Sequence, residues 1–192
     1  MTYTGGAKVV QESNMEIEFK TSISEGKYLE LIEAFEIKDN IFKQTNYYFD
    51  TDNYDLSNNK TVLRIRQRGD RYKVTLKKQS DVGAFENHVL LSKEQALDMI
   101  ENGFNTSVFF NDVNYDVTFL ASLDNYRVSI PYLDGTLFFD RCDYHGIVDY
   151  ETEFEYHDYD EGEKIFKKFL KDNNIEYVKT KRKSEKALFT KK

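Results

Sequence analysis

Charged and apolar side chains alternate along several short segments, and this alternation constrains the fold of the 192-residue chain more than any other feature. In an extended strand, successive side chains point to opposite faces. Arg64, Arg66 and Arg68 therefore share one face of a predicted strand whose other face is apolar. The segments with one charged and one apolar face are 15–21, 62–68, 71–78 and 147–156.

Two architectures satisfy this pattern. The charged faces can be the solvated side of an open sheet whose apolar side packs on a core. Alternatively, the strands form a barrel with a charged lumen and an apolar outer surface that helices cover. Charges of one sign repel each other in a lumen, so a barrel also needs opposite charges, metal ions or an anionic ligand. The chain supplies both signs in separate blocks, with eight Lys or Arg in 60–78 and eight Asp or Glu in 149–163.

The remaining periodicity predicts an α+β domain of about eight mostly antiparallel strands and three helices. Helices are expected at 24–35, at 92–102 and from Asp160 onward. No pattern assigns residues 105–120, and the residues from Lys179 onward form a basic tail.

Residues 1–14 have no clear period, so we expect a flexible extension or an added leader there and a single domain at 15–192. The formal net charge of −7 disfavours non-specific binding to nucleic acid or to an anionic membrane. No apolar run approaches the roughly 18 residues of a membrane span. Cys142 is the single cysteine, which excludes an internal disulfide, and no secretory leader opens the chain. We therefore expect a cytoplasmic protein, and its oligomeric state stays open, a homodimer included.

Carboxylates two residues apart on a strand point the same way and can share a hard divalent cation. Glu16 and Glu18 have this spacing, as do Glu151 and Glu153. Arginines at the same spacing form a fork that suits phosphate oxygens. Together these patterns indicate a metal-dependent site for a polyphosphate. The sequence contains no G-x-x-x-x-G-K-[ST] loop and no G-x-S-x-G elbow, which excludes those two kinds of site.

A series of motifs resembles a known family. Glu16-Ile17-Glu18-Phe19-Lys20 matches the E-x-E-x-K signature of CYTH-domain proteins, the triphosphate tunnel metalloenzymes. The resemblance covers about residues 15–190, and the chain is similar in style to the bacterial YjbK-like branch. The later motifs in the family's order are Tyr47-Tyr48-Phe49-Asp50-Thr51, Leu63-Arg64-Ile65-Arg66, Thr75-Leu76-Lys77, Glu86, Arg127, Leu137-Phe138-Phe139-Asp140, Tyr150-Glu151-Thr152-Glu153 and a basic C-terminus.

The resemblance implies a closed antiparallel eight-stranded β-barrel, a tunnel with a charged lumen and flanking helices. It also implies Mg²⁺ or Mn²⁺ as the cofactor and a small molecule containing a triphosphate as the substrate. The implied metal ligands are Glu16, Glu18, Asp140, Glu151 and Glu153, and the implied catalytic residues are Glu16, Glu18, Lys20 and Arg66. The implied substrate-binding residues are Lys20, Arg64, Arg66, Lys77, Glu86, Arg127, Lys183 and Lys186.

Some features leave alternatives open. Glu155 and Lys73 lie on the same strand faces as the residues expected in the lumen, and they are secondary candidates for the site. The family's middle strand often reads R-x-E-x-E, whereas here no Arg precedes Glu86 and His88 replaces the second carboxylate, so the number of metal ions stays open.

The leading interpretation of function is a metal-dependent hydrolase. It would release the terminal phosphate of inorganic tripolyphosphate or of a small organic triphosphate, such as a nucleoside or thiamine triphosphate. The first alternative is a class IV type adenylyl cyclase, which uses the same tunnel. The second is a non-catalytic module that binds polyphosphate or a nucleotide.

Overall fold

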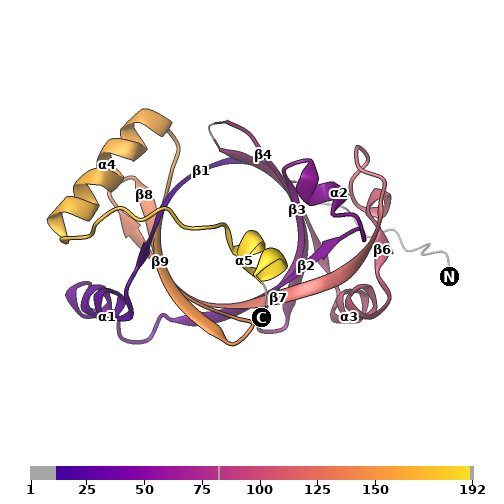
Figure 1. Cartoon of the computed structure of the whole chain (residues 1–192), viewed down its shortest axis with the longest axis horizontal. Coiled ribbons are helices and arrows are strands. Elements are labelled where there is room, and N and C mark those ends of the chain that lie inside the picture. Colours follow the sequence, from indigo (N-terminus) through magenta and orange to yellow (C-terminus); the bar gives the residue numbers. More distant parts are fainter. Residues whose placement is uncertain (1–11, 82, 191–192) are drawn as a thin grey trace.

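The computed structural model describes residues 12–81 and 83–190. Within these ranges nine strands form one sheet, and a further pairing of β2 with β7 closes eight of them into a barrel. All neighbouring strands are antiparallel. Figure 1 looks down the ring that these strands form. In sheet order the strands are β2 (Phe42–Asp50), β3 (Thr61–Arg68), β4 (Arg71–Gln79), β5 (Ala84–Leu91), β1 (Glu12–Ile23), β9 (Ile147–Tyr156), β8 (Gly135–Tyr144), β7 (Asp116–Tyr132) and β6 (Phe104–Asn105).

Helices cover the outside of the ring on two sides, and one short helix lies across its opening (Figure 1). On one side α1 and α4 flank the barrel, and α2 and α3 flank it on the other. The helices are α1 (Glu25–Ala34), α2 (Asp55–Asn58), α3 (Lys93–Asn102), the 3₁₀ turn η1 (Thr106–Val108), α4 (Tyr159–Asp172) and α5 (Lys183–Phe189).

The apolar faces of the two-faced strands point outward. Leu63 and Ile65 of β3 are buried in a cluster that includes Leu56 of α2 and Met99 of α3. Burial of such side chains stabilises a fold by about 1.5–3 kcal/mol each. The prediction of a barrel is therefore confirmed, and the alternative of an open sheet with a solvated charged face is wrong.

A second apolar cluster lies under α1 and α4. Phe166 and Phe169 of α4 pack there with Phe139 of β8 and Phe154 of β9. Phe139, Phe154 and Phe169 are completely buried. With these two clusters outside the sheet, the charged faces of the strands point into the barrel.

Helix α5 is the main element that the sequence did not predict. Its Ala187 packs inside the barrel with Tyr48, Leu123 and Cys142. The helix has seven residues, too few to be stable by intrinsic propensity. Contacts with the barrel stabilise it instead, and these contacts bring its lysines to the lumen.

Two element boundaries also differ from expectation. Strand β7 begins at Asp116, within the segment that had no assignment, and β1 begins at Glu12 rather than at Met15. Most of the expected N-terminal extension, residues 1–11, lies outside the described residues. Of the helices in the described ranges, none is both long and apolar enough to cross a membrane.

Candidate functional site

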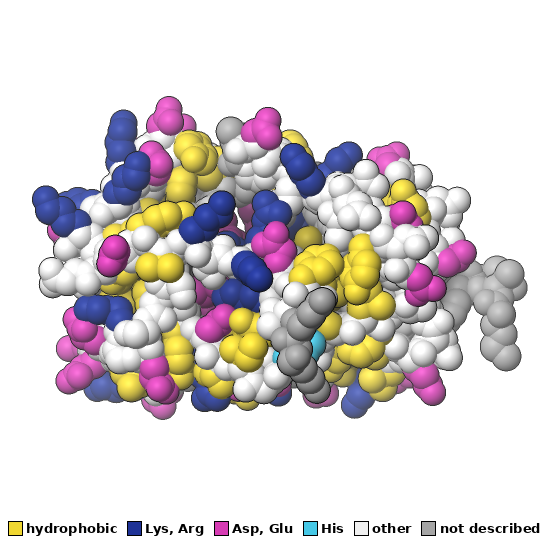
Figure 2. Space-filling view, in the orientation of Figure 1, with side chains coloured by type: hydrophobic (Ala, Val, Ile, Leu, Met, Phe, Trp, Pro, Cys, Tyr) yellow, Lys and Arg dark blue, Asp and Glu magenta, His cyan; other side chains and the backbone are white. Residues whose placement is uncertain are grey.

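A cavity of approximately 320 Å³ occupies the lumen. Figure 2 shows dark blue and magenta side chains gathered in a hollow at the centre of this face. Glu86, Asp140, Glu151 and Lys186 are not among the residues that line the cavity, but all four are buried in the interior. The predicted site residues that line it are Glu16, Glu18, Lys20, Arg64, Arg66, Lys77, Arg127, Glu153 and Lys183.

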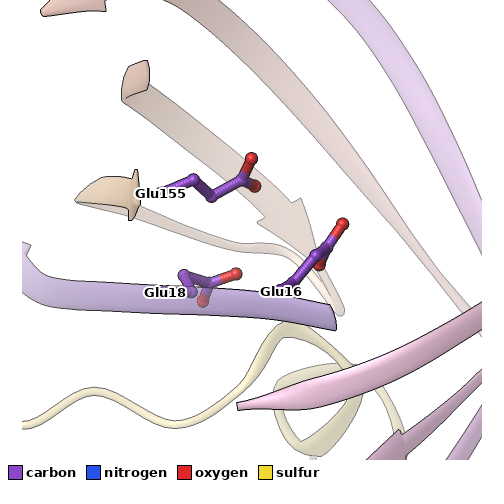
Figure 3. A group of neighbouring side chains, drawn as sticks. All are labelled: Glu16, Glu18 and Glu155. Carbon is purple, nitrogen blue, oxygen red and sulfur yellow. The ribbon is translucent and has the colours of Figure 1, made fainter. Parts of the chain in front are cut away.

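One group of carboxylates lies on the β1–β9 wall. Glu16, Glu18 and Glu155 each place an oxygen within 4.8 Å of an oxygen of the other two. Glu155 joins the group because the antiparallel register sets it directly beside Glu18. Figure 3 shows the three side chains pointing toward a shared space in the lumen. Three carboxylates at this spacing form an all-oxygen set that fits Mg²⁺ or Mn²⁺.

Lysines accompany two members of this group. The Nζ atom of Lys77 lies 2.7 Å from Glu16, and that of Lys20 lies 2.9 Å from Glu18. Glu155 has no ion pair within the described part of the chain. Burial and the nearby carboxylate of Glu16 raise the pKa of Glu155 to about 7. A cation bound among these oxygens would offset the repulsion between the carboxylates that contributes to this raised pKa.

A second group of carboxylates contains Asp140, Glu151 and Glu153, all of them buried. The ammonium group of Lys183 lies among them, 2.8 Å from Asp140 and 2.6 Å from Glu153, and it also contacts Glu151. Burial would lower the pKa of Lys183, but the carboxylates of Asp140, Glu151 and Glu153 raise it well above its ordinary value. A lysine thus occupies the position among these oxygens that a metal ion would take.

Two further cations complete this second group. Arg127 donates to Asp140 from Nε at 2.8 Å, and a second guanidinium nitrogen contacts both Asp140 and Glu153. Its guanidinium also lies 4.2 Å from the centre of the Phe138 ring. Lys186 donates to Glu151 at 2.7 Å. The five predicted metal ligands therefore fall into two groups, and only the Glu16–Glu18 group is without a lysine at its centre.

The opposite wall of the lumen is cationic. On β3, Arg64 lies 3.4 Å from Glu86, and on β4, Lys77 lies 3.2 Å from the same carboxylate. Burial would raise the pKa of Glu86, but Arg64, Lys77 and Arg66 together lower it to about 2. Glu86 therefore stays ionised and offsets part of the positive charge of this wall.

Arg66 lacks such an anionic partner among the described residues. Its Nε donates to the amide oxygen of Asn46 at 3.0 Å. Burial and the neighbouring cations Arg64 and Arg127 lower the pKa of Arg66 to about 9. An anion in the cavity would remove this electrostatic penalty, so the β3 wall is suited to bind one.

Several residues of the cavity were missed or ranked low by sequence reasoning. Tyr48 and Arg182 line the cavity, and Glu155 does so although it was held in second rank. The sequence offered one signal for Tyr48. It lies two residues after the polar Asn46, which places both side chains on the same face of the strand. Lys73 lies beside Arg66 in the β3–β4 register, outside the residues that line the cavity. His88 lies beside Thr75 in the β4–β5 register and is likewise outside that set.

Comparisons with known proteins agree with the closed barrel and its charged lumen. The family model for the CYTH domain matches residues 14–188. The chain is also 32% identical over 174 residues to the protein named "Putative triphosphatase YjbK" of Bacillus subtilis (strain 168). The aligned residues cover 88% of this chain and 92% of that protein. The chain belongs to the CYTH-domain family.

Solved structures of related proteins have the same fold. A structure described as a putative adenylate cyclase from Bacillus halodurans is 30% identical, has a TM-score of 0.85, and covers 93% of this chain and 99% of its own. The protein HpAC1 from Hippeastrum is 21% identical, with a TM-score of 0.73 and coverage of 89% of this chain and 94% of its own. Its description is that of a putative adenylyl cyclase with a dominant triphosphatase activity.

Proposed function

We propose that this protein is a metal-dependent hydrolase that releases the terminal phosphate of a triphosphate. One observation carries the proposal: within a single cavity the carboxylates of Glu16, Glu18 and Glu155 lie opposite the arginines Arg64 and Arg66. A site with metal ligands on one wall and phosphate-binding cations on the other suits a chain of linked phosphates. The relative named "Putative triphosphatase YjbK" supports the same activity.

The first metal ion is assigned to Glu16, Glu18 and Glu155. When bound, Mg²⁺ or Mn²⁺ would neutralise charge on the phosphate oxygens and lower the pKa of a bound water. Asp140, Glu151 and Glu153 would join the metal site only if Lys183 moved, because its ammonium group lies among their oxygens.

The cations of this chain would bind and orient the substrate. Arg66 has no carboxylate partner in the described structure, so it is available to a phosphate oxygen without breaking an ion pair. Arg64 and Lys77 share Glu86 and can turn toward a ligand that carries more charge. Lys20 lies between the two groups of carboxylates, 2.9 Å from Glu18 and 3.8 Å from Glu153, where it can contact a phosphate held beside the metal. These fixed charges would stabilise the charge on the phosphoryl oxygens during transfer.

The substrate is proposed to be inorganic tripolyphosphate or a small organic triphosphate. An adenylyl cyclase is the second candidate, because the solved relative from Bacillus halodurans is described as a putative adenylate cyclase. A module that only binds anions is disfavoured, because the carboxylates of Glu16 and Glu18 would weaken anion binding in the absence of a metal.

The test is the release of orthophosphate from tripolyphosphate, ATP, GTP and thiamine triphosphate. Each substrate is incubated with Mg²⁺, with Mn²⁺ and with chelator, and the products are separated. The expected result is metal-dependent orthophosphate, which ranks the substrates directly. Pyrophosphate together with a cyclic nucleotide would establish the cyclase instead, and binding without turnover would establish the binding module.

A further inference from the structure

His145 lies in the turn of the β8–β9 hairpin, outside the set of residues that line the lumen cavity. His145 and Gly146 are the two residues between the paired Tyr144 and Ile147. Both have a left-handed backbone, with φ of 50° and 79°. A two-residue turn with positive φ at both positions favours an Asn-Gly pair, so the backbone conformation does not by itself call for a histidine. The role of His145 therefore depends on what its side chain contacts.

The imidazole ring of His145 reaches the C-terminal helix. Its Nε2 atom lies 2.6 Å from the carbonyl oxygen of Ala187 in α5. A carbonyl oxygen can only accept a hydrogen bond, so Nε2 carries the proton and donates it. Helix α5 ends at Phe189, and the last four carbonyl groups of a helix have no donor within the helix. His145 therefore supplies a donor that α5 itself cannot provide.

The same hairpin holds α5 at a second point. Asp149 of β9 lies 3.1 Å from the Nζ atom of Lys186 and accepts a hydrogen bond from the hydroxyl of Tyr144 at 2.8 Å. The Tyr144 ring also contacts the His145 ring, with the two ring centres 6.2 Å apart. The hairpin thus contacts one side chain of α5 and one backbone carbonyl. The backbone contact fixes the position of the helix itself.

The position of Ala187 determines the position of Lys183. The two residues are four apart in the sequence, so they lie one turn from each other on the same face of α5. Lys183 lines the lumen cavity, and its ammonium group lies among the three buried carboxylates of β8 and β9. A helix of seven residues has little stability of its own, so its contacts with the barrel decide where its lysines lie.

We infer that His145 is a positioning residue, whose hydrogen bond to the Ala187 carbonyl holds α5 so that Lys183 keeps its place in the lumen. This inference rests on the proposed triphosphate site, because Lys183 is one of the cations of that site. His145 itself lies outside the cavity, so it acts on the substrate only through α5. The turn of the β8–β9 hairpin thereby contributes to substrate binding from outside the tunnel.

Three variants separate the hydrogen bond from other effects. His145→Ala removes the ring and its donor. His145→Gln keeps a donor, because the Nε2 atom of glutamine can take nearly the same place as the Nε2 atom of histidine. Both variants put a non-glycine residue in the left-handed turn, so a backbone cost is common to both. His157→Ala is the control for loss of a histidine, because His157 is exposed and its ring lies 4.2 Å from that of Tyr156.

The experiment combines hydrogen-exchange mass spectrometry of residues 183–189 with calorimetric titration by inorganic tripolyphosphate in the presence of Mg²⁺. Orthophosphate release by the same proteins gives kcat and KM. In His145→Ala the amides of α5 should exchange about 2- to 10-fold faster, which is the effect of one lost hydrogen bond. Tripolyphosphate should bind about 3- to 10-fold more weakly, because Lys183 is held in the lumen for less of the time. KM should rise while kcat changes by about twofold or less, because His145 does not touch the reacting phosphate. His145→Gln and His157→Ala should behave as wild type does.

Four results would overturn the inference. Wild-type exchange of α5 in His145→Ala would show that the hydrogen bond does not hold the helix. Faster exchange with unchanged affinity for tripolyphosphate would make the contact structural alone. An equal loss of affinity in His145→Gln and His145→Ala would assign the effect to the turn rather than to the donor. A wild type that binds no tripolyphosphate would remove the proposed function as well.

Failure of the proposed function alone has a different outcome. A wild type that binds tripolyphosphate without hydrolysing it, together with faster exchange and weaker binding in His145→Ala, would support the inference and remove only the hydrolase. Hydrolysis with the same KM in wild type and His145→Ala would leave the hydrolase in place and remove only the inference.

Discussion

Substitution of Lys183 by methionine would leave three buried carboxylates around an uncharged side chain. The Lys183 side chain is 10% exposed, and those of Asp140 and Glu151 are completely buried. Removal of one partner from a buried ion pair costs about 3–5 kcal/mol, because the remaining charge is not compensated. Arg127 and Lys186 still contact these carboxylates, which favours the lower end of that range. For a chain of this length the loss corresponds to a decrease in Tm of roughly 6–20 °C.

The assay is denaturant unfolding of wild type and Lys183→Met at several pH values. In wild type the pKa of Asp140 is lowered, because Arg127 and Lys183 outweigh the effect of burial. The pKa of Glu153 is lowered too, so Asp140 and Glu153 lose their stabilising contribution as the pH falls, whereas Glu151, whose pKa is raised by burial, does not. In the variant, burial without Lys183 favours protonated carboxyl groups, so the variant gains stability as the pH falls. The difference between the two proteins should be largest near pH 7 and should shrink toward pH 4.

Lys168→Met is the control for the loss of a lysine. The Lys168 side chain is 73% exposed and pairs with Asp172 on the surface of α4. An exposed ion pair contributes about 0–1 kcal/mol, so this variant should unfold nearly as wild type does. Our account of the second carboxylate group would be wrong if Lys183→Met were as stable as Lys168→Met, or if its destabilisation did not change with pH.

Three further outcomes are expected. Glu18→Gln should reduce metal-dependent orthophosphate release about 100-fold or more. It should lower Tm only modestly, because Gln keeps the size of the side chain and Lys20 still faces Glu153 at 3.8 Å; wild-type turnover would contradict the metal assignment. Arg66→Met should weaken tripolyphosphate binding without lowering the free energy of unfolding, because burial beside other cations disfavours the charged guanidinium; a large loss of stability would contradict this. Glu86→Gln should flatten the acid dependence of stability. The pKa of Glu86 in the folded protein is about 2, so its carboxylate stabilises the fold above pH 4.5 and this stabilisation is lost as the pH falls toward 2. Comparison of the unfolding midpoints of wild type and variant at pH 5 and pH 3 measures this loss.

Local sequence pattern determined the walls of the barrel. The alternation around Arg64 and Arg66 required one charged and one apolar face, because side-chain direction in a strand depends only on parity. The same argument placed Glu16 and Glu18 on one face. These assignments needed no knowledge of which strands pair.

Pairing between distant strands decided which carboxylates form a group. Glu155 lies beside Glu18 because β9 pairs with β1 in one particular register. Glu151 and Glu153 have the same parity as Glu155, yet they contact Lys183 and lie in the other group. Parity alone could not separate these three glutamates, since the position along the barrel axis depends on register.

Tertiary structure alone decided the position of the C-terminal helix and the role of its lysines. The sequence from Lys179 onward indicates only a basic tail, because a seven-residue helix has no intrinsic stability that a pattern could reveal. Inside the barrel, Ala187 packs against Tyr48, and Lys183 pairs with buried carboxylates contributed by β8 and β9. Sequence determined which faces carry charge, whereas the closed barrel decided which charges meet, because those contacts join residues far apart in the chain.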